Sequence, residues 1–506
     1  MIRTIYLIGG IAVFLLALYL GGRLFAVNKV DELIEQANKE GNKLTVGERS
    51  LSFNLLYLGL ELDDVELDQT TSGKRITGTV DHVDLDGLSV VRAMSGGVKI
   101  SDLIIDGARL KVYAVAPDTS AKKGGDGKTV SVNNLQLANS GVEIFGKDSV
   151  LKAAVSGLSA NGLLDLPLAP ASAPAIIVEA DSVFFPATDD TDQLVNDLSA
   201  DLARGQLKIG TFRLSPKQSA RNFLTTIQYK RPWQALRLAG IEASGVPFDS
   251  LLAGGRSVIH DVNIGDLNFE IYENPNLERD PAEPVKKFPV EAFRDLPQPV
   301  WLHSLIVDRA NIAYGVHVEG SEQPDITFTG TIKAGNFSTW KQDEPAFAQM
   351  DCTFEKNSPL TIRFDLDQSG DGRSFRVTGD LKKYDLTDVN PLMVVAANVN
   401  VERGNINHLT HDFSVANGVS KGELTLKYDH LEVKMEGKGA WLINLVEDIA
   451  IRDSNPRNDG ELVVGTVYAE HDPTKSFFNL YWKSVVAGMT SSVAGKVFTP
   501  EELKPK

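Results

Sequence analysis

The feature that most constrains the fold of this chain is one recurring spacing of apolar residues, apolar-x-apolar-x-x-apolar-x-apolar. Apolar residues on every second position are typical of a strand with one buried face. The additional residue in the middle turns every later side chain to the other face unless the backbone accommodates it. A β-bulge accommodates it, and a tight turn has the same effect. Six copies occur, at Leu60/Leu62/Val65/Leu67, Val98/Ile100/Leu103/Ile105, Val130/Val132/Leu135/Leu137, Leu207/Ile209/Phe212/Leu214, Val262/Ile264/Leu267/Phe269 and Val300/Leu302/Leu305/Val307.

Three of these copies continue along the chain. We interpret each unit as a strand that bends, keeps one face apolar, and then turns and returns. Stacked units of this kind predict a mainly β fold, in the form of a long, curved, antiparallel repeat sheet with an apolar groove and a few short helices. The alternative is chance recurrence among amphipathic strands. The continuations are Ala108/Leu110/Val112, Ser140/Val142/Ile144 and Ala310/Ile312/Tyr314.

The N-terminus has a different pattern. Residues 4–22 carry no charge, and apolar residues continue to Val27 past Arg23. About 20 apolar residues cross a bilayer as a helix. No small-x-small cleavage site follows, so residues 1–27 are expected to form an uncleaved transmembrane signal anchor. Basic residues on both sides, diluted by acids, leave the orientation open.

Helical spacing occurs at three further places. An amphipathic helix is expected over residues 30–41, a second over Asp192–Arg204, and a third over Ser476–Val493. Polar, Gly- or Pro-rich stretches at Ala116–Lys128 and Asn274–Lys287 are expected to be a loop and a linker. The linker predicts a division of the body into residues 28–280 and 281–506.

Composition restricts the function. The formal charge of −16 argues against non-specific nucleic-acid binding. The one cysteine, Cys352, excludes an internal disulfide and a cysteine metal cluster. No nucleophile elbow, P-loop, zinc-binding helix or dinucleotide fingerprint is present, and no enzyme activity, cofactor or metal is predicted.

Three short motifs resemble functional sites without their usual context. Ser120-x-x-Lys123 matches a nucleophile pattern inside the expected loop. Asp365-x-Asp367 resembles the start of a calcium loop, but Arg376 stands where a bidentate Glu is needed, and a hairpin turn at Asp371-Gly372 is the better interpretation. His408 and His411 lack a third ligand and are expected in a solvated turn.

The C-terminal helix carries aromatic residues on one face. These residues are Phe478, Tyr481, Trp482, Val485 and Met489. One interpretation is a terminal helix packed on the end of a sheet. The other is a plug over an apolar groove, or an interfacial contact with a membrane that also uses Lys483.

The order of these features resembles the AsmA-like family of bacterial envelope proteins, relatives of bridge-like lipid transfer proteins. The resemblance rests on the N-terminal segment, on GERSLSFNLLYLGLELDDVELD after it, and on the units VKISDLIIDGARLKVY and VSVNNLQLANSGVEIF. It also rests on the tail DLTDVNPLMVVAANVNVERGNINHLTHDFSV, on GELTLKYDHLEVKM, and on the closing HDPTKSFFNLYWKSVVAGM. The resemblance implies an inner-membrane, single-pass protein with a groove-shaped β body in the periplasm and a role in envelope lipid homeostasis. It carries over no catalytic residues.

The repeat pattern and the resemblance lead to two functional hypotheses. The first is a protein of envelope biogenesis that binds or transfers phospholipid, whose acyl chains contact an apolar groove. The second is a non-enzymatic envelope scaffold that binds protein partners and assists the assembly of outer-membrane proteins. The groove candidates are Ile100, Leu103, Ile105, Val132, Leu135, Leu137, Leu302, Leu305 and Val307.

Overall fold

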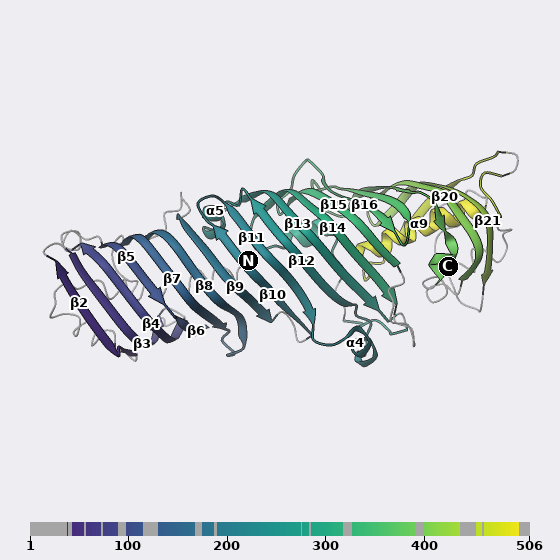
Figure 1. Cartoon of the computed structure of the whole chain (residues 1–506). Coiled ribbons are helices and arrows are strands. Elements are labelled where there is room, and N and C mark those ends of the chain that lie inside the picture. The colour runs from purple at the N-terminus through teal and green to yellow at the C-terminus, as the bar shows by residue number, and fades with distance from the viewer. Residues whose placement is uncertain are drawn as a thin grey trace. The chain divides into compact units, whose positions relative to one another are not determined.

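The structure is a computed structural model of the chain. It describes residue 38 and residues 43–54, 57–71, 74–89, 98–114, 130–166, 175–186, 190–274, 276–282, 285–316, 326–390, 399–435, 452–457 and 460–494. The expected anchor at 1–27, the expected loop at 116–128, Ser120 and most of the expected helix at 30–41 lie outside these residues. The described part is mainly β, with 22 strands and a few helices (Figure 1).

The chain forms two compact units. Unit 1 comprises residues 1–215 and 240–258, and unit 2 comprises residues 216–239 and 259–506. Each unit has its own cluster of buried apolar side chains. Residue 280 lies inside unit 2, and the division at 280 stays a prediction about domains.

The described residues of unit 1 form successive strands and one short helix, α5 (Phe248–Leu252). The strands are β1 (Lys43–Thr45), β2 (Glu48–Asn54), β3 (Tyr57–Thr71), β4 (Lys74–Ser89), β5 (Val98–Asp106), β6 (Arg109–Ala114), β7 (Val130–Phe145), β8 (Leu151–Leu166), β9 (Ile176–Pro186), β10 (Thr191–Asp201) and β11 (Gln206–Pro216). β12 (Trp233–Ser244) is divided between the two units.

Irregularities within the strands account for the recurring spacing. In β3 the two residues between Leu62 and Val65 include Asp64, which has a φ of 52°. In β7 the register against β8 shifts between Val132 and Leu135. The strands then continue in the same direction, as β7 and β14 (Val300–Val316) do for 16 and 17 residues. The bulge interpretation is therefore confirmed at the copy in β7, whereas at the copy in β3 the register against β4 does not shift across Asp64. After these strands the chain returns, as expected, in the antiparallel neighbours β4 and β8.

The sheet is mixed, so the expectation of a purely antiparallel sheet is wrong. β5 and β6 both pair with β4 in antiparallel orientation, and they are one strand interrupted at Gly107 and Ala108. The same two segments pair with β7 in parallel orientation. Gly107 has a φ of 67°, and a Cβ there would lie 2.1 Å from a carboxylate oxygen of Asp81. Two independent reasons therefore exclude a side chain at this position: the positive φ and the lack of space.

The helix expected over Asp192–Arg204 is also wrong, because most of this segment forms β10. Val195 pairs with Val183 of β9, Asn196 with Ser182 and Leu198 with Ala180, so the register of the two strands does not shift across Asp197. Asp197 has a φ of 55°. This left-handed residue lies between Val195 and Leu198, two inward-facing residues three positions apart, which imitates the spacing of a helix.

Unit 2 also consists of long strands. They are β13 (Ser257–Glu273), β14, β15 (Ile326–Ser338), β16 (Ala346–Phe354), β17 (Ser358–Leu366), β18 (Phe375–Leu381), β19 (Tyr384–Asp385), β20 (Val399–Ala416), β21 (Val419–Met435) and β22 (Val464–Glu470). Neighbours from β14 to β18 and from β20 to β22 pair antiparallel, and β18 pairs with β20. The hairpin expected between β17 and β18 is confirmed, with Gly372 at a φ of 85° in its loop.

Short helices and one long helix complete unit 2. They are α4 (Ala220–Thr226), α6 (Pro289–Arg294), the 3-10 helix η2 (Leu386–Val389) and α9 (Phe477–Ala494). α9, yellow in Figure 1, packs against β21 and β22. The helix expected over Ser476–Val493 is therefore confirmed, together with its packing on a sheet. The described part of Asn274–Lys287 contains no helix or strand, as expected.

Candidate functional site

The strands of unit 2 align their apolar residues in rows across the sheet. One row joins Leu305, Ala334, Ala348, Phe364, Val377 and Phe413, each opposite the next on the neighbouring strand. A second row joins Val307, Ile332, Met350, Ile362, Gly379 and His411. Opposed residues of an antiparallel pair point to the same face, so both rows belong to one face of the sheet.

Burial along these rows changes from strand to strand. From β18 onward the side chains are buried, with Val377 and Phe413 at most 1% exposed. On β15, β16 and β17 the same face is half-buried. We call this part the apolar face of β15–β17, and it comprises Ile332, Ala334, Ala348, Met350, Cys352, Leu360, Ile362 and Phe364.

α9 forms one border of this face. The Phe364 ring lies 5.2 Å from the Phe477 ring and 5.5 Å from the Tyr481 ring, measured between centroids. The other side chains of the helix that face the sheet join the buried cluster of unit 2. The boundary between the buried and the half-buried parts of this face therefore lies at the first turns of α9.

The structure pairs the groove candidates of unit 1 with one another. Ile100 lies opposite Val132, Leu103 opposite Leu135, and Ile105 opposite Leu137. All six are between 1% and 6% exposed and belong to the core of unit 1. In unit 2, Leu302 and Leu305 are half-buried, and Val307 is buried. Their contact with lipid stays a prediction, and β15–β17 offers more exposed apolar surface than the unit 1 positions do.

The aromatic face predicted for α9 is divided in the structure. Phe478 is 67% exposed and Trp482 is 42% exposed. Tyr481 and Met489 are half-buried and pack against the core of unit 2, and Val485 is buried within it. Packing therefore accounts for Tyr481, Val485 and Met489, and Phe478 and Trp482 stay available for another contact.

Small residues let α9 approach the sheet closely. A Cβ on Gly465 of β22 would lie 2.0 Å from the carbonyl oxygen of Gly488. The Ser484 hydroxyl lies 2.7 Å from the Ser420 hydroxyl of β21, and the Thr466 backbone N–H donates to the Ser491 hydroxyl at 3.0 Å. Residues 484–488 are all buried. Five residues exceed one turn of 3.6, so the middle of α9 is enclosed on every side.

His411 is the one histidine of the described residues that is buried on this face. It lies in strand β20, as His408 does, so the expected solvated turn is wrong. Its Nε2 and the Tyr481 hydroxyl share a hydrogen bond of 3.2 Å, and a Cβ on Gly379 would lie 2.1 Å from the same nitrogen. Nδ1 is buried and has no hydrogen-bond partner among the described residues. Burial lowers the pKa of His411 to about 4, so the ring is neutral at pH 7.

The neighbouring titratable groups are also neutral. Burial raises the pKa of the Cys352 thiol to about 11 and raises the pKa of the Tyr481 hydroxyl. A thiol with a raised pKa is a poor nucleophile, because the thiolate is the reactive form. The arrangement therefore offers apolar contact and does not offer an activated nucleophile at these three residues.

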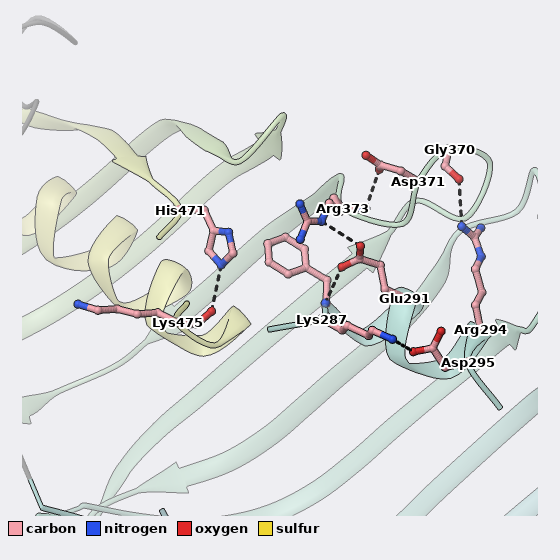
Figure 2. Close-up of polar contacts among 10 residues, drawn as sticks. Lys287, Glu291, Arg294, Asp295, Gly370, Asp371, Arg373, His471 and Lys475 are labelled. Atoms are coloured by element: carbon pink, nitrogen blue, oxygen red, sulfur yellow. Dashed lines mark hydrogen bonds and ion pairs between the residues drawn. The ribbon is translucent and has the colours of Figure 1, made fainter. Parts of the chain in front are cut away.

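α6 contacts the loop between β17 and β18, and Phe288 just before α6 contacts the residues at the start of α9 (Figure 2). Arg373 pairs with Glu291 at 3.0 Å, and Arg294 donates to the Gly370 carbonyl at 3.0 Å. The Phe288 ring lies 4.8 Å from the His471 ring and 5.6 Å from the Phe477 ring. These contacts position the residues just before α9, including Lys475, whose carbonyl accepts a hydrogen bond from His471 Nε2 at 3.1 Å.

The two remaining metal-like motifs are engaged in local contacts. The Asp365 carboxylate pairs with Arg363 at 2.7 Å, and Asp367 accepts hydrogen bonds from Ser369. His408 pairs with Asp380 at 2.9 Å. Throughout the described residues, no three His, Cys, Asp or Glu side chains are gathered as a metal site would need.

Comparison with known proteins adds no relative. No family model matches the chain, and no curated protein matches it. Among the helices of the described residues, none is both long enough and apolar enough to cross a bilayer.

Proposed function

We propose that this protein is a membrane-anchored envelope protein that binds and transfers phospholipid. The acyl chains of the lipid contact the apolar face of β15–β17. The observation that carries the proposal is the half-buried state of this face, next to strands whose equivalent residues are buried. The anchor, the inner-membrane location and the periplasmic body follow from the N-terminal sequence and the family resemblance.

The dimensions of the face suit an acyl chain. Three strands about 4.8 Å apart, and six residues of about 3.4 Å rise along β16, give an area on the order of 300 Å². That area is in the range of the largest apolar patches on monomers, which are often functional. An acyl chain fills one leaflet of about 15 Å, half of the hydrocarbon core. It can therefore lie along the strands and cover apolar atoms whose exposure costs about 25 cal/mol per Å².

The opposite face of the same strands is polar, which gives the sheet two different environments. The Thr361 hydroxyl donates to Asp351 at 2.8 Å, and the Gln349 amide donates to the same carboxylate at 2.8 Å. The Arg363 guanidinium lies over the Phe347 ring at 4.9 Å. A lipid headgroup is compatible with water and with such polar groups, whereas the acyl chain is compatible with the first face alone.

The two faces provide a matched test by photo-crosslinking in cells. A benzophenone amino acid is placed at Met350 or Ile362 of the full chain, and at Thr353 on the opposite face of β16 as the control. We expect adducts with the mass of a phospholipid at Met350 and Ile362, and at least about fivefold less at Thr353, because acyl chains contact the apolar face.

The result also separates the two functional hypotheses. Equal lipid adducts at all three positions would indicate general contact with a membrane and would overturn the proposal. Protein adducts at Met350 and Ile362 without lipid would instead favour an envelope scaffold, in which a partner protein covers this face.

A further inference from the structure

Positively charged side chains converge beside the first turn of α9. Burial lowers the pKa of Lys475 the most, three nearby cations lower it further, and one carboxylate, Asp472, raises it. The three cations are Lys483, Arg279 and Lys230. We call these four residues the basic cluster.

The basic cluster is assembled from three separate parts of unit 2. Lys230 follows α4, Arg279 lies in the segment before α6, and Lys475 and Lys483 flank the first turns of α9. Contacts fix several of them: Arg279 donates to the Thr474 hydroxyl, and Lys230 pairs with Glu273 at 3.1 Å. The fold therefore brings these cations together, although like charges repel one another.

The negative charge near Lys475 does not balance the positive charge of the basic cluster. The Asp472 carboxylate lies 3.9 Å from the Lys475 ammonium and also accepts hydrogen bonds from Thr474. Glu278 and Asp280 flank Arg279 in the sequence, yet neither is among the groups that act on Lys475. Three cations therefore act on Lys475 against one carboxylate, an arrangement that favours the binding of an anion, in a chain whose formal charge is −16.

Two exposed aromatic residues lie next to the basic cluster. Phe478 and Trp482 are four residues apart, so they share one face of α9, and Lys475 and Lys483 lie within three residues of them. Lysines with exposed aromatic residues on a helix are typical of a contact with a lipid headgroup region, where rings enter the interface and ammonium groups meet phosphates.

We propose that the first turns of α9 bind an anionic phospholipid membrane surface. Phe478 and Trp482 enter the interface, and the basic cluster contacts headgroup phosphates. A soluble anion would account for the cations and would leave the two exposed rings unexplained. The proposal goes beyond acyl-chain binding on β15–β17 and does not depend on it.

The test uses the full chain in nanodiscs of phosphatidylcholine. Vesicles of phosphatidylcholine, with or without about one third phosphatidylglycerol, are added, and the protein that floats with them is measured. We expect at least about tenfold more capture by the anionic vesicles at low salt, and a decrease as salt is raised, because each lysine near an anionic surface contributes about 1 kcal/mol.

Two double variants separate the aromatic and the charged contributions. Phe478→Ser/Trp482→Ser and Lys475→Glu/Lys483→Glu should each reduce capture at least about tenfold. The matched controls are Val150→Ser/Leu163→Ser, which removes exposed apolar residues of unit 1, and Lys333→Glu/Lys427→Glu, which reverses exposed lysines on the strands of unit 2. The controls should bind as the unmodified chain does, and all four should keep its unfolding midpoint.

Three outcomes would overturn the proposal. The first is equal capture by neutral and anionic vesicles, and the second is unchanged capture of either α9 double variant. The third is loss of capture on adding inorganic phosphate at the same phosphate concentration, which would assign the basic cluster to a soluble anion. Failure of crosslinking at Met350 would leave this result unaffected, so the two proposals fail separately.

Discussion

At the scale of single residues, His411 shows how burial on an apolar face determines the protonation state of a polar group. The ring is 5% exposed, lies over Gly379, and has one hydrogen bond, to Tyr481. The charged form of such a ring would lack solvation, so folding keeps the ring neutral. His408 and His411 are three residues apart in a part of β20 whose register does not shift, so strand alternation places them on opposite faces. The sequence did not show this because the two residues were expected in a turn.

His411 makes the stability of unit 2 depend on pH. Its folded pKa of about 4 is below the ordinary unfolded value of about 6.5, so its contribution is complete above pH 6.5 and is lost as pH falls toward 4. Between pH 7 and pH 5 the loss is about 2 kcal/mol. We expect His411→Gln to remove most of this decrease in urea unfolding, whereas His430→Gln on an exposed site should retain it. An identical decrease in the His411→Gln variant would assign the titration to another group.

At the scale of elements, one backbone feature accounts both for the correctly predicted strands and for the wrongly predicted helix over Asp192–Arg204. A left-handed residue inside a strand places two residues between inward-facing neighbours, as at Asp64 in β3 and at Asp197 in β10. Six such spacings could be recognised as strands because alternation surrounds them. In β10 the sequence around Asp197 offers four apolar residues at helical spacing, and local pattern alone cannot distinguish the two structures.

The backbone of β10 requires a residue that tolerates a positive φ at position 197. Asp197→Val should destabilise unit 1 by about 1–2 kcal/mol, because a β-branched residue is strained in the left-handed region. Asp197→Gly should stay within about 0.5 kcal/mol of the original chain. Ser199→Val, at an ordinary position of the same strand, is the control, and all three are compared by urea denaturation. Equal stability of the Asp197→Val and Ser199→Val variants would show that the backbone at 197 can relax.

The seating of α9 depends on the contact between Gly465 and Gly488. Gly465→Ala should move the helix away from β22, because its Cβ would lie 2.0 Å from the Gly488 carbonyl oxygen. We expect hydrogen exchange of α9 amides to accelerate at least about tenfold, which corresponds to about 1.4 kcal/mol of lost protection. Thr490→Ala, at a half-buried position of the same helix, should leave exchange unchanged. Unaltered exchange in the Gly465→Ala variant would mean that β22 shifts to accommodate the Cβ and that α9 stays in place.

At the scale of the whole molecule, the alternation of apolar residues predicted the mainly β class, and helical spacing predicted the C-terminal helix. Alternation could not predict the parallel pairing of β5 and β6 with β7, since both pairing directions use the same alternation. Nor could it show which inward-facing residues are buried and which are half-buried, because this depends on where α9 lies. The basic cluster could not be found either, because Lys230, Arg279 and Lys475 are distant in the sequence.

The rows that cross β14 to β18 have a consequence for how such a chain can change in length during evolution. Each antiparallel hairpin, such as β16–β17, begins and ends on the same edge and contributes matching inward-facing residues to every row. Duplication or deletion of one hairpin would therefore lengthen or shorten the apolar face by about 10 Å and leave the facing of all other strands unchanged. Insertion of a single strand would instead reverse the direction of every strand that follows. Growth in units of two strands is thus the route by which natural variants of this architecture can differ in size.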